Sequence, residues 1–566
     1  MRGAPAPLLA SGVRIQHDGA SSWTPDGVDA AVAPGEVLLV LGPSGCGKST
    51  FALALNGLVP HAVPAALHGT VTVGGVNTAQ ARVAELSEHV GMVFQDPDAQ
   101  IVTGTVLDEV CFGPENRLVP AEEVLLRAEE ALRSVGLWER RADDPDTLSG
   151  GGKQRLAIAC ALALDAPLLV LDEPTANLDG AAAEELYDIL ATLTGPGSQR
   201  SVVLVEHNLD AAMALVDTVL VLDGDGRVAA HGPAGEVLRE RAEQLLDLGV
   251  WLPTATLAAL RLRRAGLRLE PLPLTPRELE DALALNAGAV RAAPGGSAVQ
   301  EGGIAVEVDS GADAPSSAVV VRGLTLRRGP AEVLHRVSLT VARGDFVAVV
   351  GPNGAGKTSL VQAIAGLLRT PRGAVTADRV GFVFQNPEHQ FVRHSVVDEL
   401  AFSLRGLPAD DVERRVDAML DTLGLAAHRD AHPFLLSGGQ KRRLSVGTAL
   451  IAGAPLLVLD EPTFGQDRAR AAELLGMLGR LNARGTTVII VTHDLGLAAE
   501  YASHVAVLAD GRLAAFGTTA GILGDANLLH RNGLRQPPLG RVLAGPRIPA
   551  PLRGLTRLRD LPGGGA

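Results

Sequence analysis

Aromatic residues and cysteines are scarce in this chain of 566 residues, in which Phe, Trp and Tyr together make up 3%. The three cysteines, Cys46, Cys111 and Cys160, are far apart and show no CxxC spacing. This distribution argues against a disulfide framework and against a zinc site. The cysteine usage therefore fits a reducing cytoplasm.

Long apolar runs and a basic charge balance are also missing. The mean hydropathy is +0.20, but the apolar residues are mostly Ala, Val and Leu in short runs. None of these runs approaches the roughly 18–20 residues that span a bilayer, and the N-terminus shows no apolar core of a secretory signal. We expect no membrane span of its own. The net charge is −14, whereas a nucleic-acid binder carries an excess of positive charge. No nucleic-acid partner is therefore expected.

A glycine-rich loop is the feature around which the chain is organised. The segment 42–50 reads Gly-Pro-Ser-Gly-Cys-Gly-Lys-Ser-Thr and lies between the apolar run 37–41 and the helix-like run 51–55. A strand–loop–helix context of this kind is typical of a phosphate-binding loop. The glycines let backbone N–H groups surround an anion. Lys48 would reach the β- and γ-phosphates, and Ser49 would bind Mg²⁺.

The chain repeats this arrangement. A second loop at 351–358 reads Gly-Pro-Asn-Gly-Ala-Gly-Lys-Thr and follows the apolar run 347–350. Later motifs recur in the same order, and Ser149 and Asp172 map to Ser437 and Asp460, each 288 residues on. An internal duplication of ordered motifs indicates two homologous halves. Strands alternating with helices, with ligand groups at strand ends, predict a doubly wound α/β core in each half.

Two carboxylates follow a short apolar strand in each half. Asp172 and Asp460 end these strands, the place from which a Walker-B Asp holds Mg²⁺ in phosphate-loop NTPases. The adjacent Glu173 and Glu461 are candidates to polarise the attacking water, because in-line attack needs a base within hydrogen-bond reach of that water.

Two further polar pairs recur at matching places. Gln95 and Gln385 each end a short strand and can sense both metal and water. His207 and His493 each end a β-rich run and can hydrogen-bond a γ-phosphate. Their repetition favours a functional role over a structural one.

The ordered motif set resembles the nucleotide-binding domains of ABC ATPases. It comprises the phosphate loop, the Gln loop, a Leu-Ser-Gly-Gly signature at 148–151 and 436–439, Asp-Glu-Pro-Thr at 172–175 and 460–463, and the terminal His. The resemblance covers roughly residues 8–250 and 318–525. It implies two tandem domains that form an intrachain head-to-tail pseudo-dimer, each with a P-loop NTPase core, a β-rich subdomain and a helical signature subdomain.

The resemblance also implies an ATPase with ATP and Mg²⁺ as cofactors. Each ATP would lie between one half's loop lysine and the other half's signature, whose hydroxyl and glycine N–H groups form a second anion cradle at a helix N-terminus. The expected nucleotide-binding residues are Gly42, Pro43, Ser44, Gly45, Cys46, Gly47, Lys48, Ser49, Thr50, Gly351, Pro352, Asn353, Gly354, Ala355, Gly356, Lys357, Thr358, Ser359, Ser149, Gly150, Gly151, Ser437, Gly438, Gly439 and Gln440. The expected metal-binding residues are Ser49, Gln95, Asp172, Thr358, Gln385 and Asp460, and the expected catalytic residues are Glu173, Glu461, His207, His493, Gln95 and Gln385.

Two features depart from the family pattern. Gly152 stands in the first signature where the family has Gln. The aromatic residue that usually stacks on adenine is missing from both halves, and His17 and Arg328 occupy its place. Either planar group can stack on a base, and Trp23 is an alternative.

Several stretches look like the ATPases of energy-coupling-factor importers for vitamins, vitamin precursors and transition-metal ions. They are 56–61, 95–102, 106–113, 385–392 and 463–467. This resemblance implies a peripheral location on the cytoplasmic face of the membrane and separate integral membrane subunits as partners. The segment after each Gln would receive helices of such a subunit. A fused sugar-importer ATPase and a soluble tandem ABC protein acting on ribosomes or DNA are the alternatives.

The predicted domains are a first ATPase domain at 1–248, a helical appendage and flexible linker at 249–317, a second ATPase domain at 318–530 and a basic Pro/Gly-rich tail at 531–566. The tail contains seven Arg and one Asp. We expect it to be disordered, and contact with anionic lipid or RNA is the alternative.

Overall fold

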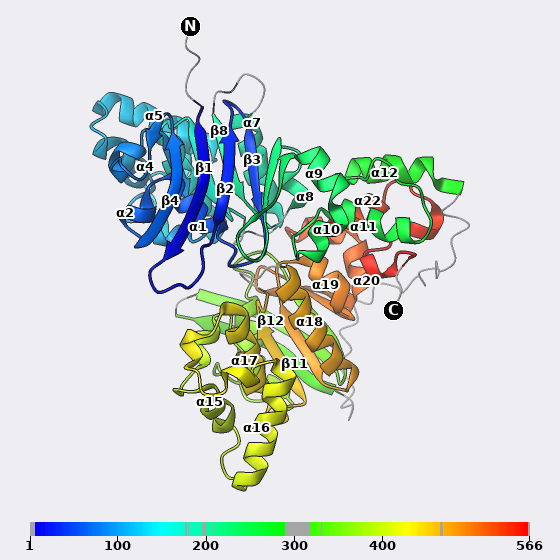
Figure 1. Cartoon of the computed structure of the whole chain (residues 1–566). Coiled ribbons are helices and arrows are strands. Elements are labelled where there is room, and N and C mark those ends of the chain that lie inside the picture. Colours follow the sequence, from blue (N-terminus) through cyan, green and yellow to red (C-terminus); the bar gives the residue numbers. More distant parts are fainter. Residues whose placement is uncertain are drawn as a thin grey trace. The chain divides into compact units, whose positions relative to one another are not determined.

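The structure is a computed structural model that describes residues 6–288 and 317–563, apart from 176, 177, 179, 195–197, 199, 208, 330 and 464–467. Most of the predicted linker and residues 464–467 of the predicted motif 463–467 lie outside the described residues. The chain forms two compact units, chiefly residues 1–290 and chiefly residues 291–562 (Figure 1). Each unit contains an α/β core, as the sequence predicts.

The first unit contains two sheets. The six-stranded sheet has the order β10-β9-β3-β8-β7-β6, and the four-stranded antiparallel sheet has the order β2-β1-β4-β5. In the larger sheet only β10 runs antiparallel to its neighbour. The strands of the first unit are β1 (Leu8–His17), β2 (Asp26–Val32), β3 (Val37–Leu41), β4 (Ala65–Val73), β5 (Val76–Asn77), β6 (Val90–Val93), β7 (Leu168–Asp172), β8 (Ser201–Val205), β9 (Thr218–Leu222) and β10 (Val228–Pro233).

The helices of the first unit include the amphipathic α5. They are α1 (Lys48–Leu55), α2 (Leu58–His61), α3 (Val83–Leu86), α4 (Val106–Asn116), α5 (Ala121–Ser134), α6 (Gly150–Ala163), α7 (Gly180–Thr194), α8 (Leu209–Ala212), α9 (Ala234–Glu240), α10 (Ala242–Asp247), α11 (Thr254–Arg264) and α12 (Pro276–Leu285). Helices α11 and α12 form the predicted helical appendage. Arg239 of α9 forms an ion pair of 3.0 Å with Glu278 of α12.

The second unit repeats this plan. Its larger sheet has the order β15-β16-β17-β13-β18-β19, and the smaller one has the order β12-β11-β14. The strands are β11 (Ser317–Arg328), β12 (Ala331–Ala342), β13 (Phe346–Val350), β14 (Val375–Ala377), β15 (Val380–Val383), β16 (Leu456–Asp460), β17 (Thr487–Val491), β18 (His504–Ala509) and β19 (Arg512–Thr518). The helices are α14 (Lys357–Ile364), α15 (Val396–Phe402), α16 (Ala409–Leu423), α17 (Gly438–Leu450), α18 (Arg468–Ala483), α19 (Leu495–Tyr501), α20 (Thr519–Gly524), α21 (Ala526–Arg531) and α22 (Pro538–Leu543).

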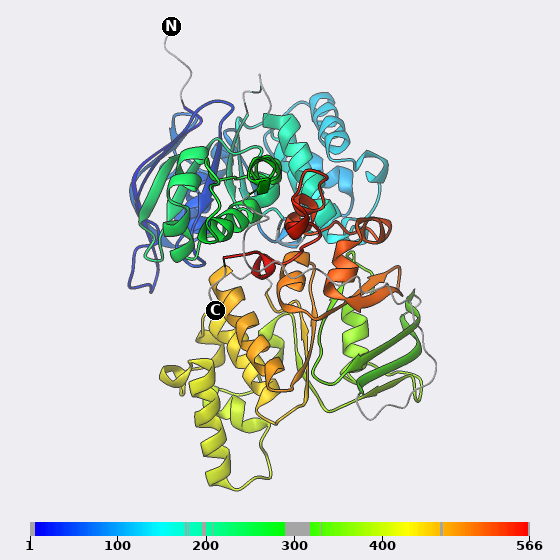
Figure 2. The same cartoon turned by 90° about the vertical axis from the view of Figure 1, so that its right-hand side faces the viewer.

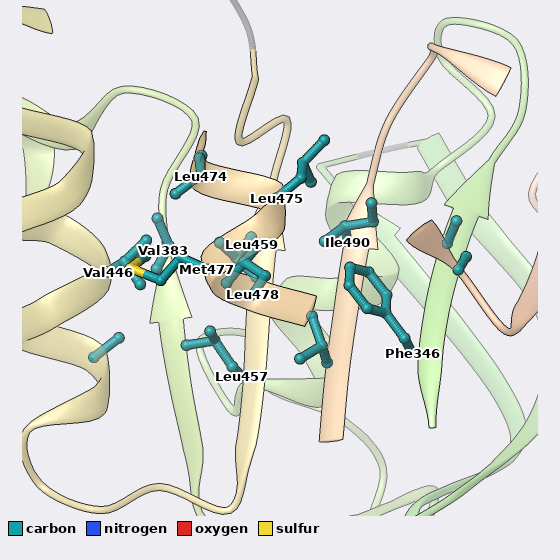
Figure 3. Packing of buried hydrophobic residues seen from close by; sticks show 14 of the residues in the cluster. Phe346, Val383, Val446, Leu457, Leu459, Leu474, Leu475, Met477, Leu478 and Ile490 are labelled. Carbon is teal, nitrogen blue, oxygen red and sulfur yellow. The ribbon is translucent and has the colours of Figure 1, made fainter. Parts of the chain in front are cut away.

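The parallel strands explain why short apolar runs suffice for this fold. All five residues of each of β3, β7, β8, β13, β16 and β17 are buried, as expected for strands covered on both faces. In the second unit, Leu474 and Leu478 of α18 pack onto Leu457 and Leu459 of β16, and Phe346 of β13 lies beside Ile490 (Figure 3). The core therefore fixes the strands whose ends carry the predicted carboxylates.

The subdomains of the second unit lie on opposite sides of its core. Figure 2 shows the helices α15, α16 and α17, in yellow, on one side and the antiparallel strands, in green, on the other. The same division into a β-rich and a helical subdomain was expected from the family resemblance. No helix within the described ranges is both long and apolar enough to cross a membrane.

The prediction that the chain is disordered after Arg531 is wrong for the residues described there. The segment contains α22 and several buried leucines. Arg557 donates a hydrogen bond of 3.1 Å to the carbonyl of Ala502, and the N–H of Leu558 donates to the carboxylate of Glu500. The arginines suggested a solvated tail, but the apolar residues between them are buried and the segment is anchored to α19.

Phe346 tests the importance of the parallel core. Its side chain is 2% exposed, so Phe346→Ala should leave a cavity and lower the free energy of unfolding by about 3–5 kcal/mol. The control is Leu367→Ala, because Leu367 is 50% exposed. Calorimetry of the whole chain should show a lower midpoint for Phe346→Ala alone, and an equal shift in both variants would contradict this assignment of the core.

Candidate active sites

The two glycine-rich loops have the same backbone geometry. Helices α1 and α14 begin at Lys48 and Lys357, directly after Gly47 and Gly356 in left-handed conformations with φ of 100° and 92°. A Cβ on Gly47 would lie 2.5 Å from the backbone nitrogen of Pro25. Only glycine fits both the dihedral angle and this close approach. Backbone packing against Thr24 and Pro25 therefore fixes the first loop where α1 begins.

The loop lysines point back over their loops. The ammonium group of Lys48 donates hydrogen bonds of 2.8 and 3.0 Å to the carbonyls of Gly42 and Pro43. Lys357 does the same toward Gly351 and Pro352, at 2.8 and 2.9 Å. Each cation is thus held inside the turn whose backbone N–H groups would surround a phosphate. The residues present fit a nucleoside triphosphate.

A hydroxyl and a carboxylate meet at each loop. Ser49 Oγ lies 3.1 Å from Asp172 Oδ1, and Thr358 Oγ1 lies 3.2 Å from Asp460 Oδ1. Burial raises the pKa of Asp172 to about 6, against the lowering effect of Ser49, and burial also raises the pKa of Asp460. Paired hard oxygen ligands beside a phosphate loop fit Mg²⁺, which would keep the buried carboxylates ionised.

The adjacent glutamates each contact the predicted histidine. His207 Nε2 lies 2.8 Å from Glu173 Oε1, and His493 Nδ1 lies 3.0 Å from Glu461 Oε2. Burial acts to raise the pKa of Glu173, but the hydrogen bond from His207 and the positive charges of His207 and Lys48 together outweigh burial, so that pKa is lowered. Burial likewise disfavours the charge on His493, but the Glu461 carboxylate outweighs it and raises that pKa. The first pair therefore favours the ionised glutamate that a general base requires.

Both glutamates have a backbone conformation that is unusual for their residue type. Glu173 has φ of 47° and Glu461 has φ of 46°. Their N–H groups donate to Val205 and Val491, at 2.9 and 3.1 Å, which holds the strained conformation. Non-glycine residues at positive φ cost free energy and concentrate at functional sites. The strain occurs at the same place in both halves, at the residue expected to activate water.

The glutamines differ between the halves. Gln95 Nε2 donates a hydrogen bond of 2.8 Å to Glu173 Oε2, so the first site joins three of the predicted residues. Within the described part of the chain, no hydrogen bond links the side chain of Gln385 to Glu461. The Gln385 carbonyl instead accepts a hydrogen bond of 2.6 Å from Arg442.

The signature segments open helices α6 and α17. Ser149 and Ser437 are the N-cap residues, and their hydroxyls accept from the N–H of Gly152 at 3.2 Å and of Gln440 at 3.4 Å. Only the second helix has a complete capping box, in which Gln440 also accepts from the N–H of Ser437. With glycine at position 152, the first helix lacks the glutamine side chain that completes the capping box, but the serine cap is still present.

The comparison with protein families decides what these paired sites belong to. The family model described as "ABC transporter" matches residues 25–176 and 334–464, once in each unit. The chain belongs to the ABC transporter family. It is an ABC ATPase with two fused nucleotide-binding domains, which hydrolyses ATP to drive transport.

Relatives extend this match over most of the chain. A putative ABC transporter ATP-binding protein of Methanosarcina acetivorans is 37% identical over 91% of this chain and 86% of its own length. A putative HMP/thiamine import ATP-binding protein of Bacillus subtilis is 36% identical over 89% and 90%. The solved structure of cbiO1 from Clostridium perfringens, part of the ABC transporter complex cbiONQ, is 28% identical over 41% of this chain and 100% of its own, with a TM-score of 0.36.

The geometry of the ABC ATPase assigns a task to each group of residues. A bound Mg²⁺ would neutralise the phosphate charge that develops during phosphoryl transfer. Lys48 and Lys357 would bind the β- and γ-phosphates, and Glu173 and Glu461 would accept the proton of the attacking water. His207 and His493 would orient these glutamates. These roles remain predictions of the site geometry.

Two buried residues near the sites were missed by sequence reasoning. Glu206, which is 2% exposed, accepts hydrogen bonds from the N–H of His207 at 2.6 Å and from the Thr175 hydroxyl. The second half has Thr492 at this place. Arg442, which is 4% exposed, holds the carbonyls of Phe384 and Gln385. A residue-by-residue comparison of the halves would have found both, because each differs from its counterpart.

The candidates for stacking on adenine lie in different surroundings. His17 Nε2 lies 3.0 Å from Thr50 Oγ1, directly beside the first phosphate loop. Arg328 donates to Gln362 of α14. Trp23 packs edge-on against His68 and carries Arg14 over its ring. His17 therefore has the contact that best supports a stacking role.

The loop lysines can be tested by nucleotide binding. Lys48→Met and Lys357→Met should each weaken ATP binding at one site by about tenfold to a hundredfold, because a charge-assisted hydrogen bond is worth about 1.5–3 kcal/mol. Titration calorimetry should then detect one tight site where the unaltered chain has two. Lys153→Met is the control, since Lys153 pairs with Asp98 and Asp146 instead, and a stoichiometry of two in both loop variants would contradict the assignment.

Proposed function

We propose that this chain is the ATPase of an energy-coupling-factor-type importer, and that it drives uptake of a vitamin, a vitamin precursor or a transition-metal ion through separate integral membrane subunits. It would act peripherally on the cytoplasmic face of the membrane, with ATP and Mg²⁺ bound at both sites. The observation that carries the proposal is the full-length likeness to the putative HMP/thiamine import ATP-binding protein, at 36% identity.

The segment after each Gln supplies a surface for a membrane subunit. Val102 is 66% exposed and Val392 is 60% exposed, which is unusual for apolar side chains held in well-defined loops. Each lies seven residues after its predicted Gln. An exposed apolar residue at equivalent places in both units supports two similar docking surfaces.

Buried glutamates fix these loops. Glu109, which is 5% exposed, accepts from the N–H groups of Val102 and Thr103 at 3.0 and 2.7 Å. Glu399, which is 3% exposed, accepts from Val392 and Arg393 at 2.8 and 2.7 Å. Charge-assisted hydrogen bonds of this kind are strong when buried. The carboxylates hold the backbone so that each valine side chain faces outward.

Co-expression of the chain with candidate membrane subunits tests the proposal. Pull-down through an affinity tag on the chain should recover an integral membrane partner, and the complex in vesicles should import solute only with ATP. Recovery of ribosomes or DNA in place of a membrane partner would overturn it.

Charged substitutions should disrupt docking. Val102→Asp and Val392→Asp should each lower recovery of the membrane subunits severalfold, because a carboxylate in an apolar interface must be desolvated. Leu285→Asp is the matched control, since Leu285 is 88% exposed at the end of α12 and does not belong to either loop. Undiminished recovery with both valine variants would contradict the assigned surface.

A further inference from the structure

The second signature segment is connected to a histidine that the first one lacks. Gln440 Nε2 lies 2.8 Å from His428 Nε2. His428 ends the short 3₁₀ helix Ala426–His428, which follows α16. The corresponding residues of the first half, 288 positions earlier, are Gly152 and Arg140. We propose that His428 is a positioning residue of the second signature, which it holds in place as a neutral hydrogen-bond acceptor.

The protonation state follows from the order of donors and acceptors. The backbone N–H of Ser437 can only donate, and it donates to Gln440 Oε1 at 2.8 Å. The amide oxygen is therefore committed to Ser437, and the amide NH₂ group faces His428. An NH₂ group can only donate, so His428 Nε2 must accept and its ring proton must reside on Nδ1. The network Ser437–Gln440–His428 is complete only with a neutral imidazole.

Protonation of His428 would break this network. A protonated imidazole donates from both nitrogens, which places two donors against each other at 2.8 Å. Gln440 could relieve this conflict by turning its amide over, but it would then present a donor to the N–H of Ser437. Either response breaks one hydrogen bond of the network. The bond lost is the one between Gln440 and His428 in the first case and the one between Ser437 and Gln440 in the second. The second signature is thus sensitive to pH through a residue outside the ATP-binding motifs.

Charged side chains lie on the segment that contains His428 and on helices α16 and α17. The adjacent Arg429 forms an ion pair with Asp417 of α16, and Asp430 follows. On α17, Lys441 pairs with Glu388 at 2.6 Å and Arg443 pairs with Glu473 at 3.2 Å. Helix α16 also carries Glu413 and Asp421. Most of these charges are paired with each other, and the half-buried imidazole remains accessible to solvent protons.

The first half provides an internal comparison. Its counterpart Arg140 donates to Asp143 at 2.7 Å and to the Thr147 hydroxyl at 3.4 Å. Gly152 has no side chain to bridge Arg140 and Ser149. The first half thus has a permanently charged donor, Arg140, at the position of His428, and it has glycine at the position of Gln440. The pH sensitivity is therefore confined to the second signature.

The test compares ATP hydrolysis between pH 5.5 and 8 in the whole chain and in three variants. His428→Gln keeps a neutral acceptor at every pH, His428→Arg supplies a permanent donor, and His432→Gln removes a nearby histidine that does not bond Gln440. Rates are taken as the ratio of each variant to the unaltered chain at the same pH, so that titration of other groups cancels.

We expect the unaltered chain to lose about two- to tenfold of its rate relative to His428→Gln between pH 8 and pH 5.5, because one hydrogen bond of the signature is lost. His428→Arg should show the low rate at pH 8, and His432→Gln should follow the unaltered chain. Identical profiles for His428→Gln and the unaltered chain, or a full rate for His428→Arg at pH 8, would overturn the proposal.

A second measurement does not depend on activity. Amide hydrogen exchange in the peptide that contains Ser437 should be faster in His428→Arg than in His428→Gln at one pH, while exchange around Ser149 should be equal in both. Equal exchange around Ser437 would also overturn the proposal. The inference concerns hydrolysis and not import, so its failure would leave the proposed transport function unaffected.

Discussion

The architecture depends on short parallel strands that are buried on both faces and end in charged side chains. β7 and β16 each deliver an aspartate and a glutamate to the edge of the sheet where a phosphate loop lies. A slip of the strand by one residue would move each aspartate away from the hydroxyl of its phosphate loop. The fixed strand sets the distance between Asp172 and Ser49, and equally between Asp460 and Thr358. The positions of the carboxylates beside the phosphate loops therefore depend on the packing of the core.

Backbone strain is the second element that both units share. Glu173 and Glu461 have positive φ although neither is glycine, and each is held by one hydrogen bond to the neighbouring strand. In this conformation each glutamate side chain contacts its histidine. The two glutamates lie 288 residues apart in the sequence and share the same positive φ.

Much of this arrangement could be predicted from the sequence, because the motifs lie at strand ends and helix starts. The loops, the carboxylate pairs and the histidines are found where the strand–loop–helix pattern places them. What could not be predicted are contacts made by residues without a motif. Glu206 accepts hydrogen bonds from the N–H of the adjacent His207 and from Thr175, and Arg442 binds the carbonyl of Gln385, which is distant in sequence. The prediction of disorder after Arg531 is wrong because it rests on the arginines of this segment, whereas the leucines between them are buried. The pairing of each loop with the opposite signature stays a prediction.

The most direct test of the account is the ATPase rate of the purified chain carrying Glu173→Gln, Glu461→Gln or both. If each glutamate activates water at its own site, each single variant should lose at least half of the rate. The double variant should fall by about a hundredfold to ten-thousandfold, the range of general base catalysis, and should still bind two ATP. A single variant with the unaltered rate, or a double variant that still hydrolyses ATP at a comparable rate, would contradict the account.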